Sequence, residues 1–370
     1  MEEGLNPGQR VVVREFAESP ADAIDTVTAL EVMAPPDPSS LGEHDVVVRV
    51  RSAAVGWVDL LMTSGQYQHM PSPPYTPGLE GAGDVVWAGS AVSDAKVGDA
   101  VIIDGFSAGP RSAGSYQRYG SFATYVVAPD YAVHPKPPAV SYDQAAGLLS
   151  SYETAYHCLI TRGRLQTGET VLIHGATGAT GLAAVQVAKL LGAKVIATGR
   201  KQAKLDVVAS QGADHVILTA GPDGSFRPFR DDVKALTNGQ GVDVVYDAVG
   251  GDISLESLRC VRFGARFLIV GWASTPDVAK GKGGRGAPRA NHLPTNLIMM
   301  KGLDVLGCPT VISTVRDPDS RAPRLAEVLF WAEAGTIHPH VSHAFALEDY
   351  REALRAKWRG DVIGGCVLHP

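Results

Sequence analysis

Cysteine is scarce in this chain of 370 residues, and its four cysteines are scattered. They are Cys158, Cys260, Cys308 and Cys366, and no C-x-x-C pair occurs among them. This spacing argues against a disulfide scaffold and against a cysteine-based zinc knot. It is typical of a protein from a reducing compartment.

Positive charge and long apolar runs are also lacking. A formal net charge of −6 gives no basic footprint for nucleic acid and no polybasic patch for a membrane surface. No apolar run approaches the ~20 residues that span a bilayer. The first residues, MEEGLNPGQR, resemble neither a signal peptide nor a transit peptide. We therefore expect a cytoplasmic protein that binds neither nucleic acid nor membranes.

The pattern of strands and helices predicted from the sequence changes along the chain. Residues 1–137 are rich in turns and short alternating strands, which predicts a small barrel or sandwich. Residues 138–311 alternate Val- and Ile-rich strands with helices, the pattern of a doubly wound parallel sheet. Residues 312–370 hold two helices and a final strand, too little for a separate domain, so we expect them to return to the first one. The predicted fold class is therefore α/β.

The segment VLIHGATGATGLAAVQVAK, residues 171–189, passes from a strand through small residues into a helix. Its core is an A-x-G-x-x-G pattern formed by Ala176, Thr177, Gly178, Ala179, Thr180 and Gly181. Small residues let the backbone approach a pyrophosphate, and the helix start directs N–H groups and partial positive charge at it. Alone, such a motif also fits an ordinary strand–helix turn. The β/α units that follow favour dinucleotide binding.

The end of the next strand selects between NADH and NADPH. An acidic residue that holds a free ribose 2′-hydroxyl is expected about 20 residues after the motif. The chain has Gly199, Arg200, Lys201 and Lys204 there instead. Nothing in this stretch repels a 2′-phosphate, and cations pair with one well. The alternative is a solvated helix start, but cations are unfavourable there unless an anion is bound. We expect NADPH.

Several stretches, taken in order, resemble the medium-chain dehydrogenase/reductase superfamily in its zinc-free branch of quinone oxidoreductases and enoyl or enone reductases. The stretches are PYTPGLEGAGDVVWAG, GSFATYVVAP, VVYDAVGGD, LPTNLIMMKGLDVLG and LEDYREAL. The resemblance covers nearly the whole chain. It implies a GroES-like β-barrel catalytic domain and a Rossmann domain that binds the cofactor.

Zinc enzymes of this superfamily use a Cys and a His–Glu pair as ligands, and four further cysteines for structural zinc. Here Trp57 lies near the place of the first Cys, and Leu79-Glu80 stands at the place of the pair. A leucine cannot ligate zinc, and a lone carboxylate is a poor site. The densest histidine cluster, HPHVSH at residues 338–343, is best explained as a polar loop. We expect no metal site.

Without a Lewis acid, the expected substrate is already electron-poor: a quinone or an α,β-unsaturated carbonyl that accepts hydride at its β-carbon. In the enoyl reductases that the chain resembles, a tyrosine ending a stretch like TSGQY donates a proton or anchors substrate. This makes Tyr67 a catalytic candidate, with a tyrosine packed at a loop edge as an equal alternative. Asp59 matches a usual family acid, with a loop cap as its alternative. Thr63 replaces an arginine frequent in quinone-reducing members.

Further cofactor-binding candidates follow from the resemblance and from the expected carboxyl edge of the sheet. They are Thr154, Asp247, Val249, Gly250, Gly271, Trp272 and Asn296. Helix packing is the alternative for Thr154, with the cofactor role slightly favoured, and Trp272 is equally explained by a plug between domains. Gly365 replaces the lysine of the family's final Gly-Lys, so no cofactor contact is expected from it.

The chain is therefore expected to be an NADPH-dependent reductase of quinones, enones or enoyl compounds. A structural or regulatory protein that only binds the cofactor is the main alternative, and a zinc alcohol dehydrogenase is less favoured. Family members are often homodimers or homotetramers paired through the edge of the cofactor sheet, and residues 303–308 (LDVLGC) are a candidate edge. Residues 279–291, Gly-rich and basic, are expected to form a mobile surface loop.

Overall fold

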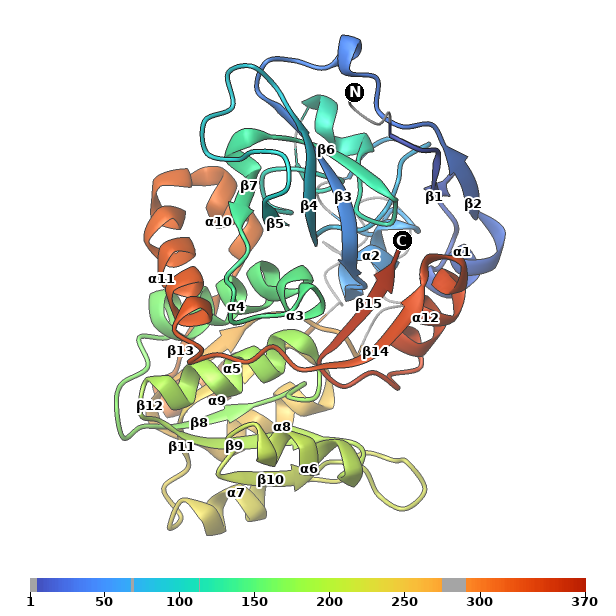
Figure 1. The fold of residues 1–370 in the computed structure, drawn as a ribbon. Coiled ribbons are helices and arrows are strands. Elements are labelled where there is room, and N and C mark those ends of the chain that lie inside the picture. Colours follow the sequence, from blue (N-terminus) through green and yellow to red (C-terminus); the bar gives the residue numbers. More distant parts are fainter. Residues whose placement is uncertain (1–4, 68–69, 113, 275–290) are drawn as a thin grey trace. The chain divides into compact units, whose positions relative to one another are not determined.

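Strands form separate sheets in the two parts of the chain, as Figure 1 shows. The computed structural model describes residues 5–67, 70–112, 114–274 and 291–370. The first compact unit holds the chain up to Ser150 and from Ala332 onward, and the second runs from Ser151 to Trp331 in its described parts. The expected loop at 279–291 lies outside the described residues except for Asn291.

The first unit is built on a mostly antiparallel sheet with the strand order β14-β15-β3-β4-β5-β7, and β6 also pairs with β3. Its strands are β3 (Asp45–Ala54), β4 (Gly81–Ala88), β5 (Ala100–Ile103), β6 (Tyr125–Pro129), β7 (Val133–Pro135), β14 (Val341–Ala346) and β15 (Gly365–His369). A separate hairpin joins β1 (Gly8–Val13) and β2 (Thr28–Met33). Alternation along β3 buries Val46, Val48 and Val50 in one core.

Short helices complete this unit. They are α1 (Pro20–Thr26), α2 (Trp57–Met62), α3 (Tyr142–Ala146) and α12 (Tyr350–Trp358). The rings of Trp57 and Trp358 stack with centroids 5.5 Å apart, which fixes α2 against α12. Serine favours helix starts, and the sequence predicts Ser141 as a cap. The cap is confirmed, because the Ser141 hydroxyl accepts the N–H of Gln144 while the Gln144 side chain accepts the N–H of Ser141.

The second unit contains the predicted parallel sheet. Its strand order is β10-β9-β8-β11-β12-β13, and each pair of neighbouring strands is parallel. The strands are β8 (Thr170–Ile173), β9 (Lys194–Gly199), β10 (His215–Leu218), β11 (Val242–Asp247), β12 (Val261–Ile269) and β13 (Asp304–Gly307). The order reverses direction between β8 and β11. Ligands bind at such a switch point, beyond the carboxyl ends of the strands.

The helices of this unit are α5 (Ala179–Leu190), α6 (Gln202–Ser210), α7 (Arg230–Leu236), α8 (Asp252–Cys260), α9 (Thr295–Lys301) and α10 (Thr310–Arg316). One predicted helix is too long. The sequence pattern predicts a helix over residues 254–264, SLESLRCVRFG, but α8 ends at Cys260 and β12 begins at Val261. Gly264 has φ +73°, a conformation that no α-helix contains.

Two helices cross from one unit to the other. Apolar residues at helical spacing predict one helix over residues 141–160. In the structure this helix breaks at Gly147 and continues as α4 (Leu148–Tyr156), which spans the division at Ser150. A π-helix, η4 (His157–Arg162), follows it directly. Near the other division, α11 (Arg321–Glu333) begins in the second unit after the short η7 (Pro318–Ser320) and ends in the first. No helix within the described ranges is long and apolar enough to cross a membrane.

Candidate functional site

The turn between β8 and α5 has the geometry of an anion-binding loop. Gly175 adopts φ +68°, and Gly178, in extended conformation, starts the helix without a side-chain cap. The first N–H groups of an α-helix have no partner within the helix, so this uncapped start presents donors. A Cβ on Gly181 would lie 2.2 Å from the Gly175 carbonyl oxygen, so only glycine allows the helix to pack this closely on the turn.

Space is left where a phosphate is expected. A Cβ on Gly178 would meet only the Gly175 oxygen, at 3.5 Å, which is ordinary contact. Ala176 is fully buried, while Thr177, Ala179 and Thr180 are half-buried around the helix start. The residues of this turn therefore fit the pyrophosphate of a dinucleotide.

The end of β9 lies beside this turn. A Cβ on Gly199 would be 3.2 Å from the Thr177 side chain and 2.9 Å from Leu205, so the strand ends without a side chain at this point. Arg200 follows and is exposed. Lys201 is the N-cap of α6, and Lys204 is half-buried in the first turn of that helix. The cations thus come directly after the glycine that adjoins the phosphate turn.

Asp247, at the end of β11, organises the next loop. One of its oxygens accepts the N–H groups of Val249 and Gly250, at 2.8 and 3.0 Å, and the other accepts the hydroxyl of Ser254. Gly250 has φ +78° and leaves room for Trp272, whose Cβ would be 2.9 Å from an added Cβ. Asp247 is therefore a buried anchor that shapes the carboxyl edge of the sheet.

The remaining cofactor candidates, Gly271, Thr154 and Asn296, lie outside the phosphate turn. A Cβ on Gly271 would approach the Ala248 carbonyl oxygen at 3.3 Å, at the end of β12. Thr154 is half-buried on α4, and Asn296 is exposed on α9. It is Asn291 that contacts the β11 loop, by accepting the N–H of Gly251 at 3.3 Å. The cofactor roles of Thr154 and Asn296 stay predictions.

His174 was missed by the reasoning from sequence, although it immediately precedes the phosphate turn. It is fully buried, with Nδ1 2.7 Å from the Thr198 hydroxyl and Nε2 2.7 Å from the Ser257 hydroxyl. Burial lowers the pKa of His174 to about 4. A histidine at the end of an apolar strand, TVLIH, was the available signal.

In the first unit, Asp59 holds two loops together. Its Oδ2 accepts the N–H of Gly56 at 2.8 Å, and its Oδ1 accepts those of Gly78 and Leu79, each at 3.1 Å. Burial raises the pKa of Asp59 to about 6, against the opposing effect of these bonds. Tyr67 is half-buried in the bend that follows α2. The catalytic roles of Asp59 and Tyr67 stay predictions.

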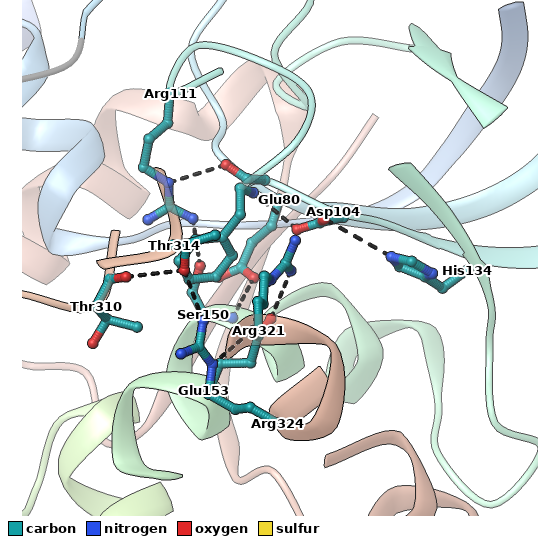
Figure 2. A network of polar contacts seen from close by, with 12 residues as sticks. Glu80, Asp104, Arg111, His134, Ser150, Glu153, Thr310, Thr314, Arg321 and Arg324 are labelled. Atoms are coloured by element: carbon teal, nitrogen blue, oxygen red, sulfur yellow. Dashed lines mark hydrogen bonds and ion pairs between the residues drawn. The ribbon is translucent and has the colours of Figure 1, made fainter. Parts of the chain in front are cut away.

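Glu80, at the place of the zinc enzymes' His–Glu pair, belongs to a buried polar cluster, drawn in Figure 2. One of its oxygens accepts the N–H of Ser150 at 3.0 Å, and Arg111 donates to the Ser150 hydroxyl at 2.8 Å and to the Gly105 carbonyl at 3.0 Å. Burial raises the pKa of Glu80 to about 7, with Arg111 opposing. Across the described part of the chain, no group of three or more His, Cys, Asp or Glu could hold a metal ion.

Two family models match the chain. The alcohol dehydrogenase GroES-like domain matches residues 42–138, and the zinc-binding dehydrogenase domain matches residues 179–316. A quinone oxidoreductase-like protein 2 homolog of Nematostella vectensis is 33% identical over 330 residues, which cover 88% of this chain and 82% of that protein. The chain belongs to the medium-chain dehydrogenase/reductase superfamily.

Other members of the superfamily agree with this placement. The human synaptic vesicle membrane protein VAT-1 homolog is 31% identical over 343 residues, covering 91% of this chain and 81% of that protein. The crystal structure of a Pseudomonas syringae quinone oxidoreductase superposes with a TM-score of 0.75 at 27% identity, over 98% of this chain and all of that one. The predicted family and the predicted GroES-like and Rossmann architecture are confirmed, and the second unit is the superfamily's NAD(P)-binding dehydrogenase domain.

Proposed function

We propose that the chain is an NADPH-dependent reductase of quinones or of α,β-unsaturated carbonyl compounds that works without zinc. The observation that carries the cofactor choice is the end of β9. Gly199 adjoins the phosphate turn at Thr177, and the exposed Arg200 follows it where NADH enzymes place a carboxylate. A guanidinium pairs with a phosphate in a bidentate manner, so this position favours a 2′-phosphate.

When bound, NADPH supplies the hydride. The chain's own part is to bind and orient. The uncapped start of α5 and the glycines of the turn hold the pyrophosphate, and the loop shaped by Asp247 and Trp272 borders the carboxyl edge of the sheet. The substrate class rests on the absence of zinc ligands at Trp57 and Leu79 and on relatives named as quinone oxidoreductases.

We propose Tyr67 as the proton donor to the enolate that forms when hydride adds to the β-carbon of an enone. Phenylalanine in its place keeps the ring and removes the only transferable proton. Tyr67→Phe should slow turnover of an enone while leaving reduction of 1,4-benzoquinone less affected, since a quinone product takes protons from water. Equal rates for wild type and variant with enones would remove Tyr67 from the mechanism.

The decisive experiment follows NADPH absorbance after mixing with 1,4-benzoquinone, a cyclic enone and an enoyl thioester. Loss of absorbance with any of these acceptors supports the proposal. Tight NADPH binding without turnover would instead support the second candidate, a protein that binds the cofactor for a structural or regulatory purpose. That candidate is favoured by the likeness to a relative named as a synaptic vesicle membrane protein. About one zinc per chain on metal analysis would point to an alcohol dehydrogenase.

We also propose that two copies associate through the open edge of the parallel sheet. β13 ends that sheet, and exposed apolar side chains lie near it. The Phe263 side chain is 76% exposed and lies over Gly302. Met299 and Met300, which precede Gly302 in the sequence, are 73% and 57% exposed. Sedimentation analysis should show a dimer or tetramer that Phe263→Ser weakens, and a monomer at all concentrations would refute the association.

A further inference from the structure

A buried carboxylate fixes α4 to the last helix of the second unit. Glu153, with no exposed surface, accepts hydrogen bonds from Arg321 Nε at 3.0 Å and Nη2 at 2.7 Å, and from Arg324 Nε at 2.9 Å. Both arginines are buried, with 7% and 2% of their surface exposed. Figure 2 shows the two guanidinium groups converging on Glu153. We call these three residues the Glu153 clamp.

The clamp extends to the segment that follows β13. Arg324 Nη2 donates to the hydroxyl of Thr314 at 2.7 Å, and that hydroxyl donates to the carbonyl of Thr310 at 3.0 Å. Glu153 is separated from Arg324 by 171 positions in the chain. The clamp thus joins the first helix of the unit to α10 and α11, in one set of directional, charge-assisted bonds.

Such a cluster is a costly way to stabilise a fold. Well-packed apolar side chains of similar volume often serve as well as a buried ion pair or better, because the charges lose their hydration. What the ions add is geometry, since a bidentate carboxylate–guanidinium pair is satisfied in only one relative orientation. The clamp therefore defines the position of α4 more strictly than apolar packing does.

The position of α4 matters because of where its side chains lie relative to the sheet. The helix continues into η4, whose Arg162 donates from Nε to the carbonyl of Gly307, the last residue of β13, at 3.0 Å. Further along, the backbone carbonyls of Gly163 and Arg164 accept from Arg266, which pairs with Asp304 at the start of β13. The helix thus runs from the carboxyl ends of the strands toward their amino ends. Thr154 lies eight residues before Arg162, about 12 Å of helix rise, and therefore on the side of the carboxyl ends of the strands.

We propose that Glu153 is a positioning residue that holds Thr154 at the nicotinamide half of the cofactor site. The inference rests on the proposed NADPH binding and extends it. Glu153 itself touches no cofactor, and it acts through the placement of α4. The adenosine and 2′-phosphate half of the site, at Gly199 and Arg200, lies on other elements and is independent of the clamp.

The test compares binding of the whole cofactor with binding of its adenosine 2′-phosphate half alone. Glu153→Gln removes the charge, and the double variant Glu153→Gln with Arg324→Met keeps the sum of buried charges unchanged. For both, calorimetry measures Kd for NADPH and for 2′,5′-ADP, and steady-state kinetics measure kcat with a quinone. We expect Kd for NADPH to rise about tenfold or kcat to fall about tenfold, while Kd for 2′,5′-ADP stays within about twofold of wild type.

Glu169→Gln provides the matched control. Glu169 pairs with Arg266 and Arg262 in the same unit, but at the amino end of β8, which is the opposite edge of the sheet. This variant should lower the melting temperature and leave both dissociation constants and kcat unchanged. Glu153→Asp, which keeps the charge but has a shorter reach, should recover part of the loss seen with glutamine.

The outcomes are distinct. If the Glu153 variants lower the melting temperature as Glu169→Gln does, and NADPH affinity and kcat equal those of wild type, the clamp is only structural and the inference is overturned. If NADPH and 2′,5′-ADP weaken together, the variants disturb the whole unit, and the inference is also overturned. If wild type binds neither NADPH nor 2′,5′-ADP, the proposed function itself fails.

Discussion

The Nε2 atom of His174 donates its proton to the hydroxyl of Ser257, 2.7 Å away. The direction of this hydrogen bond follows from the other bond of Ser257, whose hydroxyl donates its own proton to the Ile253 carbonyl at 2.6 Å. Nδ1 is then left to accept from the Thr198 hydroxyl at 2.7 Å. His174 is thus a neutral imidazole of defined tautomer at the base of the phosphate turn.

This arrangement predicts a loss of stability in acid. The folded pKa of His174 is about 4, against 6.5 for a free histidine, so between these values the unfolded chain binds a proton that the folded chain does not. The free energy of unfolding should therefore fall as the pH drops from 6.5 toward 4, by about 1.4 kcal/mol per pH unit from this residue. Urea denaturation of wild type and His174→Asn at pH 7 and pH 5 measures it. The difference between the two proteins should shrink by about 2 kcal/mol on going to pH 5.

For Glu80 we expect the opposite dependence of the free energy of unfolding on pH. Its folded pKa of about 7 exceeds the value of 4.5 for a free glutamate, so the folded chain keeps a proton that the unfolded chain has released. Stability from this residue is fully present below pH 4.5 and is lost as the pH rises to 7. Glu80→Gln keeps an acceptor for the Ser150 N–H and cannot ionise. Relative to wild type it should gain roughly 3 kcal/mol between pH 4.5 and pH 8. A pH-independent difference between the two proteins would contradict the assignment.

Two glycines of the phosphate turn should respond differently to alanine. Gly181→Ala places a Cβ 2.2 Å from the Gly175 oxygen and should lower the free energy of unfolding by several kcal/mol, about the cost of overpacking a core. Gly178→Ala meets nothing closer than 3.5 Å and has an ordinary φ of −85°. It should melt near the wild-type temperature yet bind NADPH at least about tenfold more weakly, since the methyl group enters the space for the pyrophosphate. If Gly178→Ala binds NADPH as tightly as wild type, the pyrophosphate does not bind at this turn.

The cations after β9 should distinguish the two nicotinamide cofactors. Arg200→Ala combined with Lys201→Ala removes charge-assisted partners of a 2′-phosphate, each worth about 1.5–3 kcal/mol. Kd for NADPH should rise roughly 10- to 100-fold, while Kd for NADH, which lacks that phosphate, changes little. Fluorescence titration with both cofactors measures the two constants. Equal effects on both would refute the 2′-phosphate assignment.

The fold was largely predictable because its signals are local. Alternation in β3, the strand–helix repeats after residue 138 and the small residues at Ala176–Gly181 each depend on neighbours in sequence. The error at Cys260 arose because helix and strand propensities are similar over VRFG, and the pairing of Val261 with Val242 decides it.

The buried charges were not predictable from sequence. Glu153 and its two arginines are polar residues in amphipathic helices, and such residues normally face solvent. Only the three-dimensional packing brings Arg321 and Arg324 to a carboxylate that lies 168 and 171 positions earlier in the chain. The same holds for Glu80, whose hydrogen-bond partner Ser150 and nearby charge Arg111 belong to different parts of the chain. The visible sign was that Glu153 is the single charged residue of α4, LLSSYETAY.

Within the residues that the structure describes, the chain passes from one unit to the other inside α4, between Ser150 and Ser151, and returns inside α11, between Trp331 and Ala332. Proteases cut extended, exposed segments, and neither crossing offers one. Limited digestion should therefore not release the two units as separate fragments. A recombinant second unit that begins at Ser151 would start in the middle of a helix, without the turn that precedes Glu153. The two units are distinct in structure, but for expression and for truncation they have to be handled as one piece.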